Sequence, residues 1–129
     1  MTDDFAHRIR VRYCETDQMG VAHHGSYVDW FEEARTEWMR RRGKTYRQME
    51  EGGDLLQVVG IDIRYRKSVT YDDEIDIAVD VRETGGASVV LGYEVRLADG
   101  GALVATGTTR LACVGTNGRP KRLPEDLRS

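Results

Sequence analysis

Residues 13–42, YCETDQMGVAHHGSYVDWFEEARTEWMRRR, decide the fold, because they join an isolated loop acid to the most clearly amphipathic segment of the chain. From about residue 27 onward, apolar side chains recur at intervals of three and four, which places them on one face of a helix. These residues are Tyr27, Trp30, Phe31, Ala34 and Trp38. Charged residues fill the positions between them. We therefore expect a helix that is covered by protein on one side.

Both ends of this helix are indicated by the sequence. Ser26 and Asp29 can form a capping pair at its start, and acidic residues follow in the first turns. A run of arginines precedes Gly43, which is the order that the helix dipole and a C-terminal glycine favour. The N-terminus of the helix therefore offers free backbone N–H groups beside Asp17. Such a place can bind and polarise a carbonyl oxygen.

The composition excludes several classes of binding partner. With 129 residues the chain is most simply one domain, residues 1–129, and its 19 basic and 22 acidic residues are dispersed. This excludes a dedicated nucleic-acid or membrane surface, and no apolar stretch approaches the roughly 20 residues that cross a bilayer. We expect a soluble cytoplasmic protein. Cys14 and Cys113 lie in strand-like segments, where we expect buried, unpaired thiols.

The remaining sequence alternates between apolar and polar residues, as strands do. Strands are expected over residues 7–14, 56–69, 74–82, 88–97 and 102–114, with Ile9, Val11 and Tyr13 sharing one face of the first. Gly60 is expected to mark a bulge in the long second strand. Residues 44–51 can form another turn or two of helix, and the segment after residue 120 is expected to be a loose tail.

One strand, one long helix and four further strands predict an α+β fold, a curled antiparallel five-stranded sheet wrapped around one central helix. An antiparallel sheet of this kind leaves edge strands open, and such an edge commonly pairs with a second subunit. We therefore expect a homodimer, or a dimer of dimers.

Residues 13–35 resemble the signature of the hotdog-fold acyl-CoA thioesterases, in particular the 4-hydroxybenzoyl-CoA thioesterase group and its short-chain acyl-CoA relatives. That pattern runs approximately Y-x-x-T-D-x-x-G-x-x-x-H-x-x-Y-x-x-x-x-E-x-x-R. The sequence agrees with it at Tyr13, Thr16, Asp17, Gly20, His24, Tyr27, Glu32 and Arg35. The expected order of helix and strands matches the family over essentially the whole chain.

The resemblance implies hydrolysis of a small acyl- or aryl-CoA thioester, with no metal or redox cofactor, since coenzyme A is part of the substrate. Asp17 falls at the position of the family's catalytic carboxylate, and His24 at the position whose backbone N–H holds the thioester oxygen. Gly20, Val21 and Tyr27 are candidates for substrate binding around them. A carboxylate can attack the carbonyl carbon or deprotonate water, and the sequence leaves both roles open.

Coenzyme A also needs cations for its phosphates. Candidates for binding it are Arg64, Arg66, Lys67 and Ser88, together with Arg119, Lys121 and Arg122 near the C-terminus. Well-known family members carry a basic turn before the serine that starts the fourth strand. Here Ser88 follows Gly85, Gly86 and Ala87, so this sequence departs from the family at that turn.

Three alternatives compete with a thioesterase. Cys14, Asp17, His23 and His24 are residue types that bind zinc, but adjacent histidines on a helix diverge by about 100°, so we expect no metal site. A hotdog dehydratase or hydratase would need a histidine paired with an acid, and no second carboxylate pairs convincingly with His24. A non-catalytic acyl-CoA-binding module is the third. The acyl group, and the choice between coenzyme A and acyl carrier protein, stay open.

Overall fold

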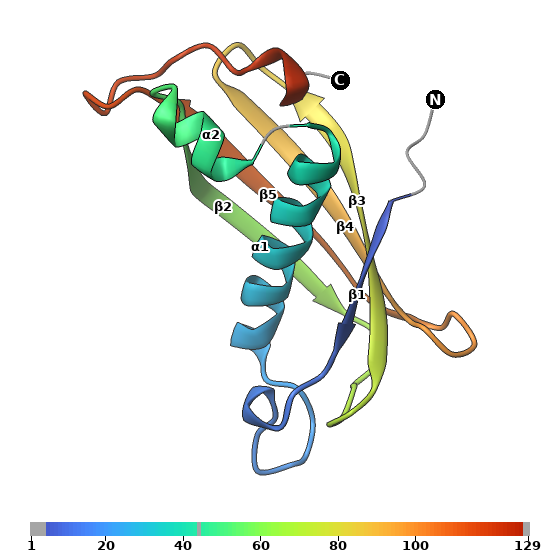
Figure 1. Cartoon of the computed structure of the whole chain (residues 1–129). Coiled ribbons are helices and arrows are strands. Elements are labelled where there is room, and N and C mark those ends of the chain that lie inside the picture. The colour runs from blue at the N-terminus through green and yellow to red at the C-terminus, as the bar shows by residue number, and fades with distance from the viewer. Residues whose placement is uncertain (1–4, 44, 128–129) are drawn as a thin grey trace.

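The structure is a computed structural model that describes residues 5–43 and 45–127. Five strands form one antiparallel sheet in the order β1-β3-β4-β5-β2. The strands are β1 (Ala6–Arg10), β2 (Leu55–Tyr65), β3 (Glu74–Thr84), β4 (Ser88–Leu97) and β5 (Leu103–Val114). The long helix α1 (His24–Arg41) crosses one face of the curved sheet, and the short helix α2 (Tyr46–Glu51) follows it (Figure 1). The predicted α+β architecture of one helix against a five-stranded sheet is confirmed.

Helix α1 packs on the sheet through the predicted apolar face. Each of the five predicted residues, Tyr27, Trp30, Phe31, Ala34 and Trp38, is at most 2% exposed. Three further residues of the helix, Ser26, Arg35 and Met39, are also buried. The helix ends at Arg41 with Arg42 as its C-cap, in agreement with the arginine run before Gly43. No helix in the described part of the chain is long and apolar enough to cross a membrane.

Strands β3, β4 and β5 form a meander in which each strand pairs antiparallel with the next. In strand β2 the register against β5 shifts between Val58 and Gly60, which confirms the predicted bulge. Because of this shift, Val58 pairs with the buried Leu111 and Ile61 with the buried Thr109. Val58 thus takes the helix-facing position that simple alternation would have given to Val59.

Two predictions about the ends of the chain are wrong. Strand β1 stops at Arg10, and Tyr13 and Cys14 belong to a 3-10 turn, η1 (Tyr13–Glu15), in which both side chains are exposed. The segment after residue 120 is not loose, because Leu123 is fully buried and Leu127 is 2% exposed. Both leucines extend the core beyond the last strand. Alternation alone could not separate a true strand from an extended segment without a partner.

A close contact between helix and sheet fixes the depth of α1. The ring of Phe31 stacks on that of Tyr93 in β4, with centroids 4.2 Å apart and planes 5° apart. Beneath the edge of Phe31 lies Gly107 of β5, where an added Cβ would meet Phe31 Cε2 at 2.5 Å and the Asp62 carbonyl oxygen at 2.9 Å. A side chain at this position would therefore push the helix away from the sheet.

Gly107→Ala is expected to lower the free energy of unfolding by about 1–3 kcal/mol, the usual cost of overpacking a filled core. Urea denaturation followed by circular dichroism measures it. Gly86→Ala is the matched control, because an added Cβ there meets nothing within 4 Å. Equal stability of the two variants would contradict the proposed packing.

Candidate active site

A tight turn carries Asp17. The amide of Gly20 donates to the carbonyl of Asp17, and the amide of Asp17 donates to the carbonyl of Val21, each at 2.9 Å. Gly20 has a φ of +80°, a conformation that glycine adopts without steric cost. The Asp17 carboxylate accepts the Met19 amide through Oδ1 at 2.9 Å. One carboxylate oxygen is thus held by the turn, while the Asp17 side chain is exposed.

The turn is anchored on both sides. Thr16 and Ala22 form an isolated β-bridge across its base, and Val21 forms another with Thr70, which follows strand β2. The amide of Ala22 donates to the carbonyl of Val69 at 2.8 Å. These bonds tie the Asp17 turn to the chain between β2 and β3, so the turn is built into the fold.

Glu15 connects this loop to helix α1, and its importance was not predicted. It is 7% exposed, and its carboxylate accepts Trp30 Nε1 at 2.8 Å and the Arg12 amide at 2.7 Å. Its carbonyl accepts Ser26 Oγ and the His23 amide, both at 3.0 Å. Burial acts to raise the pKa of Glu15, but the hydrogen bonds from Arg12 and Trp30 outweigh it and lower the pKa overall.

Helix α1 starts earlier than predicted, at His24, with His23 as its N-cap. The expected capping pair of Ser26 and Asp29 is wrong, because Ser26 lies inside the first turn and bonds to Glu15 instead. The first turn contains no acidic residue. His24 is therefore the first helical residue, and its N–H has no acceptor within the helix. Its backbone stands at the electropositive end of the helix dipole.

Asp17 and His24 line the same cleft, a hollow of about 470 Å³ between the start of α1 and the end of β2. The predicted residues Val21, Tyr27, Arg66 and Lys67 line it as well. Met19, Ala22, His23, Tyr65 and Ser68 complete the lining. The cleft therefore combines a carboxylate, a free helix end and two cations.

Six predicted site residues lie outside this cleft: Gly20, Arg64 and Ser88, and the C-terminal cations Arg119, Lys121 and Arg122. Arg64 is on β2, but its Nε bonds to Asp62 Oδ1 at 3.1 Å, away from the lining residues. Gly20 shapes the turn without lining the hollow. Ser88 begins β4, next to the Gly85 turn and not in the Asp17 cleft.

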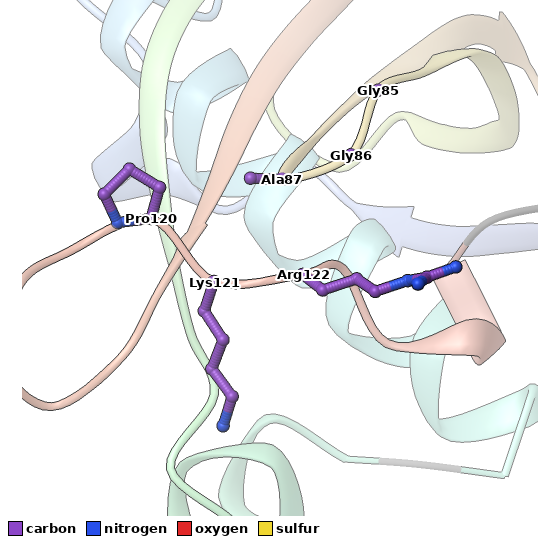
Figure 2. A pocket seen from close by; sticks show the side chains of 6 residues that line it. All are labelled: Gly85, Gly86, Ala87, Pro120, Lys121 and Arg122. Atoms are coloured by element: carbon purple, nitrogen blue, oxygen red, sulfur yellow. The ribbon is translucent and has the colours of Figure 1, made fainter.

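The turn before Ser88 faces the C-terminal segment. Gly85, Gly86 and Ala87 line a second hollow of about 440 Å³ together with Pro120, Lys121 and Arg122 (Figure 2). The side chains of Lys121 and Arg122 leave the chain in different directions (Figure 2). Lys121 Nζ lies 2.8 Å from Asp54 Oδ1, just before strand β2.

Comparison with known proteins identifies the family. Residues 11–129 match the family model described as the thioesterase-like superfamily. The chain belongs to this superfamily. The acyl-CoA thioesterase YbgC of Haemophilus influenzae is 30% identical, over 100% of this chain and 95% of that protein. Membership of the superfamily makes the protein a thioester hydrolase.

Solved structures agree with the thioesterase family. A DHNA-CoA thioesterase from Staphylococcus aureus is 34% identical and has a TM-score of 0.87, over 92% of this chain and 79% of that one. A hypothetical protein from Aquifex aeolicus is 31% identical and has a TM-score of 0.90, over 96% and 99% of the two chains. The sequence resemblance to hotdog thioesterases is thereby confirmed.

Arg35, a position of the thioesterase motif, is buried in the core. It is 5% exposed; its Nε donates to the Tyr46 hydroxyl at 2.6 Å and its Nη1 to the Tyr93 hydroxyl at 3.2 Å. Burial acts to lower the pKa of Arg35, but the two phenols outweigh it and raise the pKa overall. The spacing could have shown this burial, since residue 35 lies four positions after Phe31 on the apolar face.

Glu15→Gln is expected to lower the free energy of unfolding by about 1.5–3 kcal/mol at about pH 7, because a charged acceptor is lost. Folding lowers the pKa of Glu15 below its ordinary value of 4.5, so its stabilisation is present above that value and disappears as the pH falls through the folded value. Urea denaturation should therefore show the difference in the free energy of unfolding between variant and wild type shrinking as the pH falls below 4.5.

The control for this experiment is Glu50→Gln, a change of an exposed acid on α2. It is expected to alter stability by no more than about 0.5 kcal/mol. A Glu15→Gln difference that stayed constant with pH would show that the carboxylate charge does not stabilise the loop.

Proposed function

We propose that the protein hydrolyses the thioester of a small acyl- or aryl-CoA to the free acid and coenzyme A, with Asp17 and the His24 amide acting on the thioester. The observation that carries this proposal is that Asp17 and His24, the first residue of α1, line one cleft. The names of the related thioesterases support it. No step requires a metal or a redox cofactor.

The reaction uses a partial positive charge beside the carbonyl oxygen and a negatively charged group on the other side of the carbonyl carbon. When the thioester carbon is attacked, negative charge develops on its oxygen, and a fixed backbone N–H at a helix N-terminus stabilises that charge. The Asp17 carboxylate supplies the negative group on the other side. The geometry serves attack by the carboxylate itself or by a water molecule that it deprotonates. The carbon–sulfur bond then breaks, and the coenzyme A thiolate takes up a proton. On the route in which the carboxylate itself attacks, a water molecule then hydrolyses the mixed anhydride, which releases the free acid and restores the Asp17 carboxylate.

A second subunit is supported by the edge strand β2, whose last residue, Tyr65, lines the cleft. Strand β2 is a sheet edge of 11 residues, and no strand among the described residues pairs with its outer side. Its apolar side chains are only half covered, with Val58 50%, Val59 57% and Ile61 44% exposed. A free edge with apolar side chains favours pairing with another strand. We propose that β2 pairs antiparallel with β2 of a second copy, giving a homodimer with twofold symmetry.

This dimer would also gather cations for the phosphates of coenzyme A. Antiparallel pairing of β2 with itself places the Leu55 end of one copy beside the Tyr65 end of the other. Lys121, which bonds to Asp54 next to the Leu55 end, would then approach the cleft of the second copy. Arg66 and Lys67 are already in that cleft. The C-terminal segment therefore offers cations where the turn before Ser88 has none.

Asp17→Asn is expected to lower the rate of thioester hydrolysis by at least about 10²-fold, because the amide can neither attack nor deprotonate water. The amide oxygen can still accept the Met19 N–H, so the turn should persist. A thiol-release assay measures the rate. Asp99→Asn, a change of an exposed acid outside the cleft, is the control. Unchanged turnover of Asp17→Asn would refute the mechanism.

Ile61→Lys is expected to shift the protein from dimer to monomer, because pairing two β2 strands would bury a charge in an apolar contact. Sedimentation velocity at micromolar concentration measures the change. Ala78→Lys places the same charge on an exposed position of β3, inside the sheet, and should leave the dimer intact. A dimer that persists in Ile61→Lys would rule out β2 as the interface.

A further inference from the structure

His23 shares one face of the Asp17 turn with the carboxylate. Thr16 and Ala22 face each other in a short antiparallel ladder at the base of this turn, and the Asp17 amide donates to the Val21 carbonyl at 2.9 Å. Side chains alternate between the two faces of such a ladder, so Asp17 and His23, each one position beyond this pair, fall on the same face. Diagonal neighbours of this kind have Cα atoms about 7–8 Å apart. Both residues line the cleft.

The first turn of α1 orients the ring of His23. Ser26 Oγ lies 3.3 Å from His23 Nε2 and 3.5 Å from Nδ1. Because the Ser26 hydroxyl donates its one proton to the Glu15 carbonyl, it can only accept a hydrogen bond from the ring. A neutral imidazole that donates from one nitrogen keeps a lone pair on the other. The His23 side chain is exposed, so this second nitrogen can accept a proton in the cleft.

Attack by Asp17 itself creates a need for a second proton acceptor. Once the carboxylate has attacked, it is part of the mixed anhydride and cannot deprotonate water. Arg66 and Lys67 in the cleft are cations, which donate protons and do not accept them. The Tyr27 phenol stays protonated, because burial and then the neighbouring Tyr65 raise its pKa to about 12. The remaining proton acceptors that line the cleft are the two imidazoles.

Of the two histidines, His23 is the one that shares a ladder face with Asp17. His24 already belongs to α1, and its ring packs against that of Tyr65 on β2, with the ring centroids 4.7 Å apart. His23 is the N-cap, so its backbone is still extended and continues the ladder that carries Asp17. The strand geometry therefore places the His23 imidazole beside the group that would be acylated.

We propose that His23 is a second catalytic residue, which deprotonates the water molecule that hydrolyses the mixed anhydride on Asp17. This inference rests on the proposed function and selects its nucleophilic route. The free ring nitrogen takes a proton from water while the water oxygen bonds to the acyl carbon of the substrate. The bond between that carbon and the Asp17 oxygen breaks, which releases the acid and restores the carboxylate. His23 then passes its proton to the coenzyme A thiolate or to solvent.

The test follows coenzyme A release and acid formation separately through the first turnover, with hexanoyl-CoA or benzoyl-CoA, whichever the wild type hydrolyses faster. In His23→Asn the helix should start at the same place, because asparagine is a favoured N-cap. Its amide cannot accept a proton from water. The variant should therefore release about one equivalent of coenzyme A per subunit in a rapid burst, with acid formation lagging behind. Steady-state turnover should then be at least about 10²-fold slower than in the wild type.

His7→Asn is the matched control, because His7 on β1 pairs with Glu33 at 2.6 Å and does not line the cleft. It should keep the wild-type rates of both steps. Circular dichroism verifies that each variant is folded. Unchanged turnover of His23→Asn, or an equal slowing of coenzyme A release and acid formation without a burst, would overturn the inference while leaving Asp17-dependent hydrolysis standing. Absence of hydrolysis of every acyl- and aryl-CoA by the wild type would instead overturn the proposed function.

Discussion

The hydrogen bonds of Glu15 hold the Asp17 loop against the start of α1, and the candidate site depends on them. The carboxylate binds Trp30 from the buried face of the helix, while the backbone carbonyl binds the first turn through His23 and Ser26. Loop and helix are thereby fixed to one another by a single residue. A charged acceptor that is buried and fully bonded is costly to disturb, so this contact is also a rigid one.

The two sides of the site differ in how they are held. The side formed by the Asp17 turn and α1 is fixed, whereas the side formed by β2 is partly exposed in a single chain. On the α1 side, the turn and the helix end are held by hydrogen bonds in the protein interior. On the β2 side, Tyr65 is half-exposed, and β2 is an edge strand of the sheet. Such an arrangement suits a thioester with a long coenzyme A arm, because the reacting carbonyl needs fixed groups whereas the arm needs an entrance. The proposed second subunit would close that entrance without rebuilding the fixed half.

Residues whose position depends on local spacing were well predicted. The apolar face of α1 and the bulge at Gly60 follow from periodicity and glycine placement, and the structure confirms them. Residues whose position depends on distant partners were not predicted correctly. Glu15 looks like any loop acid in the sequence. Tyr13 continues the alternation of β1 but lies in the turn η1, and no strand in the described part of the chain pairs with it.

By itself, the sequence determined the fold class, the family and the pairing of a loop carboxylate with a helix start, because these follow from short-range spacing along residues 13–42. The tertiary structure alone decided which other groups share the cleft. Arg66, Lys67 and Tyr65 come beside Asp17, while Arg64 turns away and Ser88 lies elsewhere. The physical reason is that strand register brings the end of β2 to the N-terminal loop, together with the bonds that Val21 and Ala22 make to Thr70 and Val69. Local periodicity encodes neither.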